Sequence, residues 1–276
     1  MKLADAHIHL FANGYHRPGL PALFGNRELE AYEALRLTHG IELALVIGYE
    51  ADGIDPSNNA HIRRLSASRS WLRTLAFADL DAAVDLQRIE QWMDAGHQGL
   101  AIYALDRERS DRVLAWPRSC WRALEDRHAT VSLNTRPEAI VALGRLIAAW
   151  PGVQFLISHL GLPGVIGSET PVQTPAERLA PLLDLAHLSN VYVKISGLYA
   201  TSQPPHAYPH LGADVLIQMI LSAFGPARCL WASDFSPALE YVSFPQTVDW
   251  PGCETLSESD RCLIYRDNLF RLLSVR

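Results

Sequence analysis

Asp5-Ala6-His7-Ile8-His9 ends the first predicted β-strand of the chain, and no other stretch constrains the fold as strongly. Side chains alternate between the two faces of a strand, so His7 and His9 are expected on one side, with Asp5 one step lower on that side. Two neutral imidazoles on one rigid strand could bind a single metal ion. The alternative is a pair of histidines held in ordinary hydrogen bonds, with the carboxylate of Asp5 orienting one of them.

Short apolar segments alternate with longer helical patterns eight times along the chain. Several segments are almost continuously apolar, which is typical of parallel strands covered on both faces. The predicted strands are Leu3–His9, Leu43–Gly48, Leu72–Ala78, Gly99–Ala104, Thr130–Asn134, Val153–His159, Val191–Ser196 and Cys229–Asp234. We therefore expect an α/β protein, a single (β/α)8 TIM barrel spanning residues 1–276, with long loops over its C-terminal face.

Capping signals place helices between the strands. Asn26 and Asp81 are predicted N-caps, and Gly40 and Gly96 follow the ends of the same two helices. Pro175 opens a later helix, because proline is favoured at the first helical position.

Composition restricts the class of protein. The 276 residues are 49% hydrophobic and 20% charged, with a formal net charge of -6 and no basic run, which argues against a nucleic-acid partner. We expect no leader and no membrane span. The four cysteines include no Cys-x-x-Cys pair, which predicts free thiols and a cytoplasmic enzyme. A homodimer is the default expectation for such a protein.

Polar side chains stand at the carboxyl ends of the predicted strands, where barrel enzymes hold their active sites. His7 and His9 end the first strand, and Asp234 ends the eighth. A barrel pairs the eighth strand with the first, so Asp234 is expected beside the two histidines. This combination is typical of a hydrolytic metal site or a proton-transfer site. The other strand-end candidates are Asn134, His159, Lys194 and Ser196.

Four long connections follow strand ends and are expected to cover a pocket: residues 11–25, 163–174, 201–210 and 235–256. The residues that could line this roof are Tyr15, Arg17, Tyr199, Tyr241 and Trp250. We expect His206 and His210 at the surface of a proline-rich loop, and Trp231 to face the outer helices.

The chain resembles the amidohydrolase superfamily, in the branch that holds 2-pyrone-4,6-dicarboxylate lactonase, sugar lactonases and metal-dependent aromatic decarboxylases. The resemblance rests on Asp-Ala-His-Ile-His at residue 5, Phe-Leu-Ile-Ser-His-Leu-Gly at residue 155, Val-Lys-Ile-Ser-Gly-Leu at residue 193, Leu-Trp-Ala-Ser-Asp-Phe at residue 230, and the closing Tyr-Arg-Asp-Asn-Leu at residue 265. It implies that His7, His9 and Asp234 hold a metal. It also implies that Asp234 activates water or shuttles the proton, and that His159 orients the water or polarises the substrate carbonyl.

The chain departs from the family's sequence pattern at several positions, and these departures change what is expected of the metal site and the substrate site. The fourth strand has no lysine, which argues against two metals, and Asn134 stands where related decarboxylases offer a histidine. Ala101 stands where many members of the family carry an arginine, so the usual carboxylate anchor is either missing or supplied by Arg136. We expect one divalent ion, Zn²⁺, while a metal-free mechanism based on the histidines stays open. The candidate substrate-binding residues are Tyr103, Asn134, Arg136, Lys194 and Tyr199.

The predicted function is that of a hydrolase that opens a small lactone or related cyclic ester, with Asp234 as the general base. A metal-dependent decarboxylase of an aromatic or unsaturated acid is one alternative. A non-catalytic barrel that binds a small molecule is the other.

Overall fold

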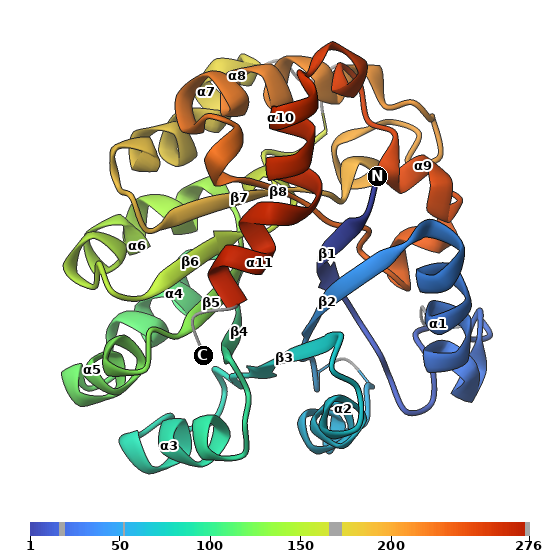
Figure 1. Cartoon of the computed structure of the whole chain (residues 1–276). Helices are drawn as coiled ribbons and strands as arrows, with labels where there is room; N and C mark the ends of the chain where they lie inside the picture. Colours follow the sequence, from blue (N-terminus) through green and yellow to red (C-terminus); the bar gives the residue numbers. More distant parts are fainter. Residues whose placement is uncertain (17–19, 52, 166–172, 274–276) are drawn as a thin grey trace.

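The computed structural model describes residues 1–16, 20–51, 53–165 and 173–273. Its centre is a parallel sheet in the order β1-β2-β3-β4-β5-β6-β7-β8, surrounded by helices (Figure 1). The strands are β1 Leu3–Ile8, β2 Ile41–Ile47, β3 Leu72–Phe77, β4 Gly99–Ala104, β5 Thr130–Thr135, β6 Gln154–Ile157, β7 Val191–Ile195 and β8 Cys229–Trp231. The predicted (β/α)8 TIM barrel and its eight strands are confirmed, with ends shifted by a few residues.

Contacts between β1 and the segment after β8 join the last strand of the barrel to the first. Ile8 forms a parallel bridge with Phe235, and the backbone N–H of Asp234 donates to the carbonyl of His7 at 2.9 Å. Because both contacts lie beyond the end of β8, they fix the segment that carries Asp234 directly against the histidine strand.

Eleven α-helices lie in the described part of the chain, and most of them cover the outside of the barrel (Figure 1). They are α1 Glu28–His39, α2 Asn58–Ala67, α3 Leu86–Asp94, α4 Arg107–Leu114, α5 Arg118–Asp126, α6 Pro137–Ala149, α7 Pro175–Leu183, α8 Asp214–Phe224, α9 Phe244–Val248, α10 Glu258–Cys262 and α11 Asn268–Leu273. Gly40 ends α1 with φ of 67°, as predicted. The two predicted N-caps are wrong: a 3₁₀ turn over Gly25–Arg27 precedes α1, and Asp85 caps α3.

One end of the barrel is closed by apolar side chains. Ala4, Ala6 and Leu230 from the strands form one buried cluster with Leu269 and Leu272 of α11. In Figure 1, α11 lies across this mouth of the barrel. These side chains and α11 therefore close this end of the barrel to solvent.

A register shift in β1 changes the expected position of Asp5. Asp5 pairs with Ala44 and Ile8 pairs with Val46, so three steps of β1 are matched to two steps of β2. Ala44 and Val46 both belong to the outer hydrophobic cluster, and Asp5 and Ile8 therefore face outward. The prediction that Asp5 shares a face with His7 is wrong, because simple alternation does not hold across an inserted residue.

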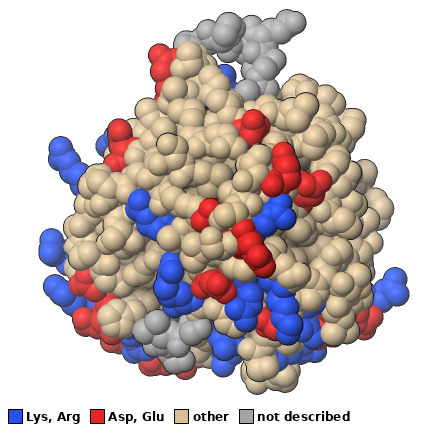
Figure 2. Space-filling model, turned by 45° about the horizontal axis from the view of Figure 1, so that its top comes forward, with Lys and Arg blue, Asp and Glu red and all other residues tan. Residues whose placement is uncertain are grey.

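The surface carries charges of both signs. On the face shown in Figure 2, Lys and Arg side chains are interspersed with Asp and Glu. Within the described residues, no helix combines the length and apolar character needed to cross a bilayer. None of the four cysteines is in a disulfide.

Candidate active site

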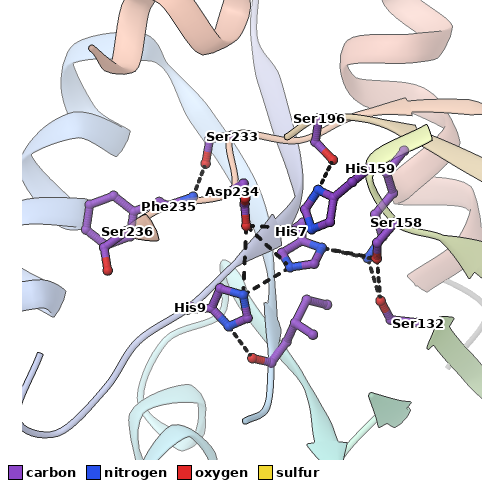
Figure 3. Close-up of polar contacts among 12 residues, drawn as sticks. His7, His9, Ser132, Ser158, His159, Ser196, Ser233, Asp234, Phe235 and Ser236 are labelled. Atoms are coloured by element: carbon purple, nitrogen blue, oxygen red, sulfur yellow. Dashed lines mark hydrogen bonds and ion pairs between the residues drawn. The ribbon is translucent and has the colours of Figure 1, made fainter. Parts of the chain in front are cut away.

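His7 and His9 project together into the upper end of the barrel (Figure 3). Their Nε2 atoms lie 3.1 Å apart, and His9 Nδ1 lies 2.9 Å from the carbonyl oxygen of Ile47. That carbonyl can only accept, so His9 carries its proton on Nδ1 and presents the lone pair of Nε2. Burial lowers the pKa of His7 well below its usual value, and it lowers the pKa of His9 to about 4. Both imidazoles are therefore neutral at pH 7 and able to bind a metal.

Asp234 faces the two histidines from the segment after β8. Its Oδ1 lies 3.6 Å from His7 Nε2, 3.8 Å from His9 Nε2 and 4.0 Å from His159 Nε2. Its Oδ2 accepts a hydrogen bond of 2.7 Å from the hydroxyl of Tyr199. Burial raises the pKa of Asp234 to about 6. Its backbone φ of 57° is unusual for a non-glycine residue, and such conformations are often kept at functional sites.

His159 completes the group from the end of β6. Its Nδ1 lies 3.0 Å from Ser196 Oγ, which leaves Nε2 directed toward Asp234 (Figure 3). Burial lowers its pKa to about 3. Gly197 is required behind this ring, because a Cβ at that position would lie 2.5 Å from His159 Nδ1. The local sequence Ser-Gly after β7 thus both orients and makes room for the imidazole.

Lys194 lies beneath the histidines and is completely buried. Its Nζ donates to Ser132 Oγ at 2.7 Å and lies 3.2 Å from His7 Nδ1. Burial lowers its pKa to about 7, although the carboxylates of Asp234 and Asp5 oppose the shift. Lys194 is on the inner face of β7, as Tyr192 is, but it does not line the pocket above. The structure therefore places this predicted substrate-binding residue below the site.

The ligand atoms fit a single divalent cation. One nitrogen each from His7 and His9 and a carboxylate oxygen of Asp234 lie within 4.8 Å of one another, and all three residues are buried. Two neutral imidazoles and one carboxylate form a donor set suited to Zn²⁺.

A pocket of about 530 Å³ opens above these residues. His9, His159 and Asp234 form part of its lining. Of the other predicted residues, Tyr15, Tyr103, Asn134 and Tyr199 also line it. Sequence reasoning missed Tyr49 and Ile54, which line it from the segment after β2 and show no motif.

Several predicted residues lie elsewhere. Arg136 is exposed and lines a different hollow together with Arg178, so the structure does not bring this predicted anchor to the pocket. Tyr241 stacks on Tyr199 with ring centroids 4.6 Å apart, whereas Trp250 is buried against Tyr265. Arg17 lies outside the described residues.

The structure also tests the predictions for three residues that do not line this pocket. Trp231 faces the outer layer as predicted, and its Nε1 donates to the carbonyl of Thr247 at 2.7 Å. His206 is exposed. The prediction for His210 is wrong, because this residue is buried and its Nδ1 lies 3.0 Å from Ser202 Oγ.

Glu28 is a further residue that the sequence did not reveal. It is buried at the start of α1, where its carboxylate accepts from the backbone N–H of Phe11 and Tyr15 and from the hydroxyl of Ser236. These bonds tie the loop after β1 to the segment after β8. An acidic residue in a first helical turn ordinarily indicates only a favourable helix dipole, so the pattern held no signal for this role.

Comparisons with known proteins bear on the family and the fold of the chain. A family model described as amidohydrolase matches residues 4–274. No curated protein sequence matches the chain. An amidohydrolase from Burkholderia multivorans, solved with bound zinc, has a TM-score of 0.82 and 18% identity, and the match covers 100% of both chains.

Two other solved structures are similar over almost their whole length. One, from Acinetobacter baumannii with citric acid bound, is described as a "probable 2-pyrone-4,6-dicarboxylic acid hydrolase"; its TM-score is 0.76 at 15% identity, over 99% of this chain and 100% of that one. The other is 5-carboxyvanillate decarboxylase from Sphingomonas paucimobilis, with a TM-score of 0.62 at 13% identity, over 100% and 99%. At these identities the three structures show a common fold and leave the reaction of this chain open.

Proposed function

The chain belongs to the amidohydrolase family, and on that premise we propose that it is a hydrolase that opens a small lactone or related cyclic ester. One observation carries the proposal: the Oδ1 atom of Asp234, at the floor of the pocket, faces three imidazole Nε2 atoms at 3.6 to 4.0 Å. A base, neutral imidazoles and a space for substrate are therefore assembled at one point.

Asp234 and His159 divide the chemistry between them. Water adds to the lactone carbonyl carbon while Asp234 accepts a proton from that water. His159, neutral and fixed by Ser196, polarises the carbonyl or orients the water. The bond from the carbonyl carbon to the ring oxygen then breaks, the ring oxygen takes up a proton, and the product is a hydroxy acid. At neutral pH the acid ionises and releases one proton to the solvent.

A divalent ion fits the same residues. His7, His9 and Asp234 would hold it, and we propose Zn²⁺ because two imidazoles and a carboxylate are common ligands of catalytic zinc. Such an ion polarises a carbonyl group and lowers the pKa of bound water. In the metal-free alternative, the neutral imidazoles of His7, His9 and His159 themselves provide the polar groups around the carbonyl.

The test is acid release from a panel of lactones and cyclic esters, followed with a pH indicator, with zinc quantified in the same preparation. We expect acid release that is lost in Asp234→Asn and retained in Asp126→Asn, a matched change at an exposed aspartate at the end of α5. Zinc near one equivalent, with activity lost on chelation and restored by Zn²⁺, would support the metal-bound form.

Other outcomes would change the assignment. Release of carbon dioxide from an aromatic or unsaturated acid, without lactone opening, would indicate a decarboxylase. Tight ligand binding that is unaffected by Asp234→Asn, with no product formed, would indicate a non-catalytic binding barrel.

A further inference from the structure

Glu28, the first residue of α1, is almost completely buried although it carries a carboxyl group. The backbone N–H of Phe11 donates to its Oε2 at 2.6 Å. The backbone N–H of Tyr15 and the hydroxyl of Ser236 donate to its Oε1 at 2.7 and 2.5 Å. Burying a carboxylate is costly unless hydrogen bonds compensate, and all three of these donors come from outside α1. Glu28 therefore connects other segments of the chain to the start of this helix.

Two of the donors belong to the turn that follows β1. The N–H of Gly14 donates to the carbonyl of Phe11 at 3.2 Å, and Tyr15 follows directly. Gly14 has a φ of 77°, and a Cβ at this position would collide with the carbonyl of Gly25, just before α1. The carboxylate of Glu28 thus accepts from the N–H groups at both ends of a turn that packs against the beginning of α1.

This turn forms part of the pocket. Phe11 and Tyr15 both line it, and the ring of Phe11 stacks on that of His9 with centroids 5.4 Å apart. His9 is one of the three residues that could hold a metal ion. A shift of the turn would therefore change the wall that a substrate contacts and also the surroundings of the His9 ring.

The third donor belongs to the segment that carries the proposed base. Ser236 is the second residue after Asp234 (Figure 3), and Pro237, the next residue, lines the pocket. Asp234 lies beyond the end of β8 with a φ of 57°. Such a backbone conformation persists only where the surrounding structure imposes it. The hydrogen bond from Ser236 to Glu28 is one of the contacts that hold this segment in place.

We propose that Glu28 is a positioning residue of the active site, which joins the turn after β1 to the segment after β8 and so fixes the pocket wall and Asp234 relative to each other. The inference rests on the proposed hydrolysis, in which Asp234 must lie within proton-transfer distance of the attacking water. Glu28 is absent from the described lining of the pocket, so it acts through the residues that donate to it.

Two variants separate the two connections of Glu28. Ser236→Ala removes the bond from the Asp234 segment and leaves the turn in place, so kcat for the opened lactone should fall by about tenfold with little change in KM. Glu28→Gln keeps one acceptor oxygen for Tyr15 and Ser236. Its amide nitrogen cannot accept from the N–H of Phe11, so KM should rise by about tenfold while kcat falls less.

Amide hydrogen exchange tests the same contacts without a substrate. The N–H of Phe11 should exchange at least about tenfold faster in Glu28→Gln than in the wild type, because it loses its acceptor. The matched control is Glu30→Gln, which changes an exposed glutamate in the same first turn of α1. This control should leave both the exchange rate and the kinetics unchanged.

A double variant tests whether Ser236 acts through Glu28. Glu28→Met removes both connections, because a thioether is a weak acceptor. Adding Ser236→Ala to Glu28→Met should then lower kcat by no more than about twofold, whereas independent effects would multiply. A further tenfold loss would overturn the connection to the Asp234 segment. Rates refer to the folded fraction, and if Glu28→Met does not fold, Ser236→Ala and Glu28→Gln decide the proposal by themselves.

The outcomes separate this proposal from the proposed function. A wild-type kcat in Ser236→Ala together with a wild-type KM in Glu28→Gln would overturn the positioning role, even if the N–H of Phe11 exchanged faster. If the wild type opens no lactone, hydrolysis is overturned, and the affinity for Zn²⁺, measured by competition with a chelator, decides the positioning role. Binding weakened by about tenfold or more in Ser236→Ala would support it, and equal binding would overturn it.

Discussion

Two buried aspartates, Asp5 on β1 and Asp234 after β8, have similarly raised pKa values but different hydrogen-bond partners. Asp5 and Asp234 are both almost fully buried, and burial raises the pKa of each to about 6. Asp5 accepts four hydrogen bonds: from the N–H of His7 at 3.3 Å, from the N–H and Oγ of Ser233 at 2.9 and 2.6 Å, and from Tyr32 Oη at 3.1 Å.

In Asp234, one carboxylate oxygen accepts a hydrogen bond and the other faces the histidines. Tyr199 donates to Asp234 Oδ2, but Oδ1 faces three imidazole nitrogens at 3.6 Å or more, beyond hydrogen-bond distance. A raised pKa therefore does not by itself distinguish a catalytic carboxylate from a structural one. What distinguishes the two residues is that Oδ1 of Asp234 still has room for a ligand, whereas both oxygens of Asp5 accept hydrogen bonds. The following predictions test this difference.

The largest expected effect is the loss of turnover in Asp234→Asn. An amide cannot accept the proton of water, so kcat/KM for the opened lactone should fall by about 10²–10⁴-fold. Initial rates of acid release measure it. Asp5→Asn is the comparison variant, and its folded fraction should lose far less activity. Equal losses in the two variants would contradict the distinction.

Asp5→Asn should instead reduce stability. Its amide nitrogen cannot accept from the donors of Ser233 and Tyr32, and a buried donor left without an acceptor is costly, so the free energy of unfolding should fall by about 2–3 kcal/mol. Urea unfolding at pH 8, where the native carboxyl is ionised, measures the change. Ser233→Ala, which removes one donor and leaves the carboxylate, should cost less. A wild-type midpoint in Asp5→Asn would show that the four hydrogen bonds add nothing.

On the acidic side, the activity should depend on pH through Asp234 and not through Asp5. The base must be ionised, so kcat/KM should fall as the pH decreases through about 6, where its raised pKa lies, and by about tenfold for each further unit. Asp5 has a similar pKa but takes no part in the reaction. The same fall of kcat/KM near pH 6 should therefore appear in the folded fraction of Asp5→Asn. A limb near pH 4, or one that moves in that variant, would be inconsistent with the assignment.

Tyr199→Phe should give the smallest change. The hydrogen bond from Tyr199 lowers the pKa of Asp234, so its removal should move the acidic limb to higher pH and reduce kcat/KM at pH 6 by on the order of tenfold. Tyr241→Phe keeps the stacked ring and serves as the control. An unshifted limb would mean that Tyr199 only shapes the pocket wall.

Much of this arrangement followed from local patterns. Apolar runs located all eight strands, because strands buried on both faces must be apolar along their length. The closing of strand eight on strand one then predicted that Asp234 lies beside His7 and His9, and the distances of 3.6 and 3.8 Å from its Oδ1 to their Nε2 atoms confirm it.

The sequence did not determine which way single side chains point. Asp5 faces outward because of a register shift that depends on how β1 pairs with β2, and Lys194 lies under His7 because β7 turns that face inward. Arg136 leaves the pocket because it stands one residue beyond the end of β5, at the N-cap of α6. Spacing along a chain sets which residues share a strand, whereas pairing register and the angle of each loop depend on the packing of the whole barrel. The primary structure therefore specified the barrel and its histidine-aspartate centre, and the tertiary structure alone settled which of its buried charges face a substrate.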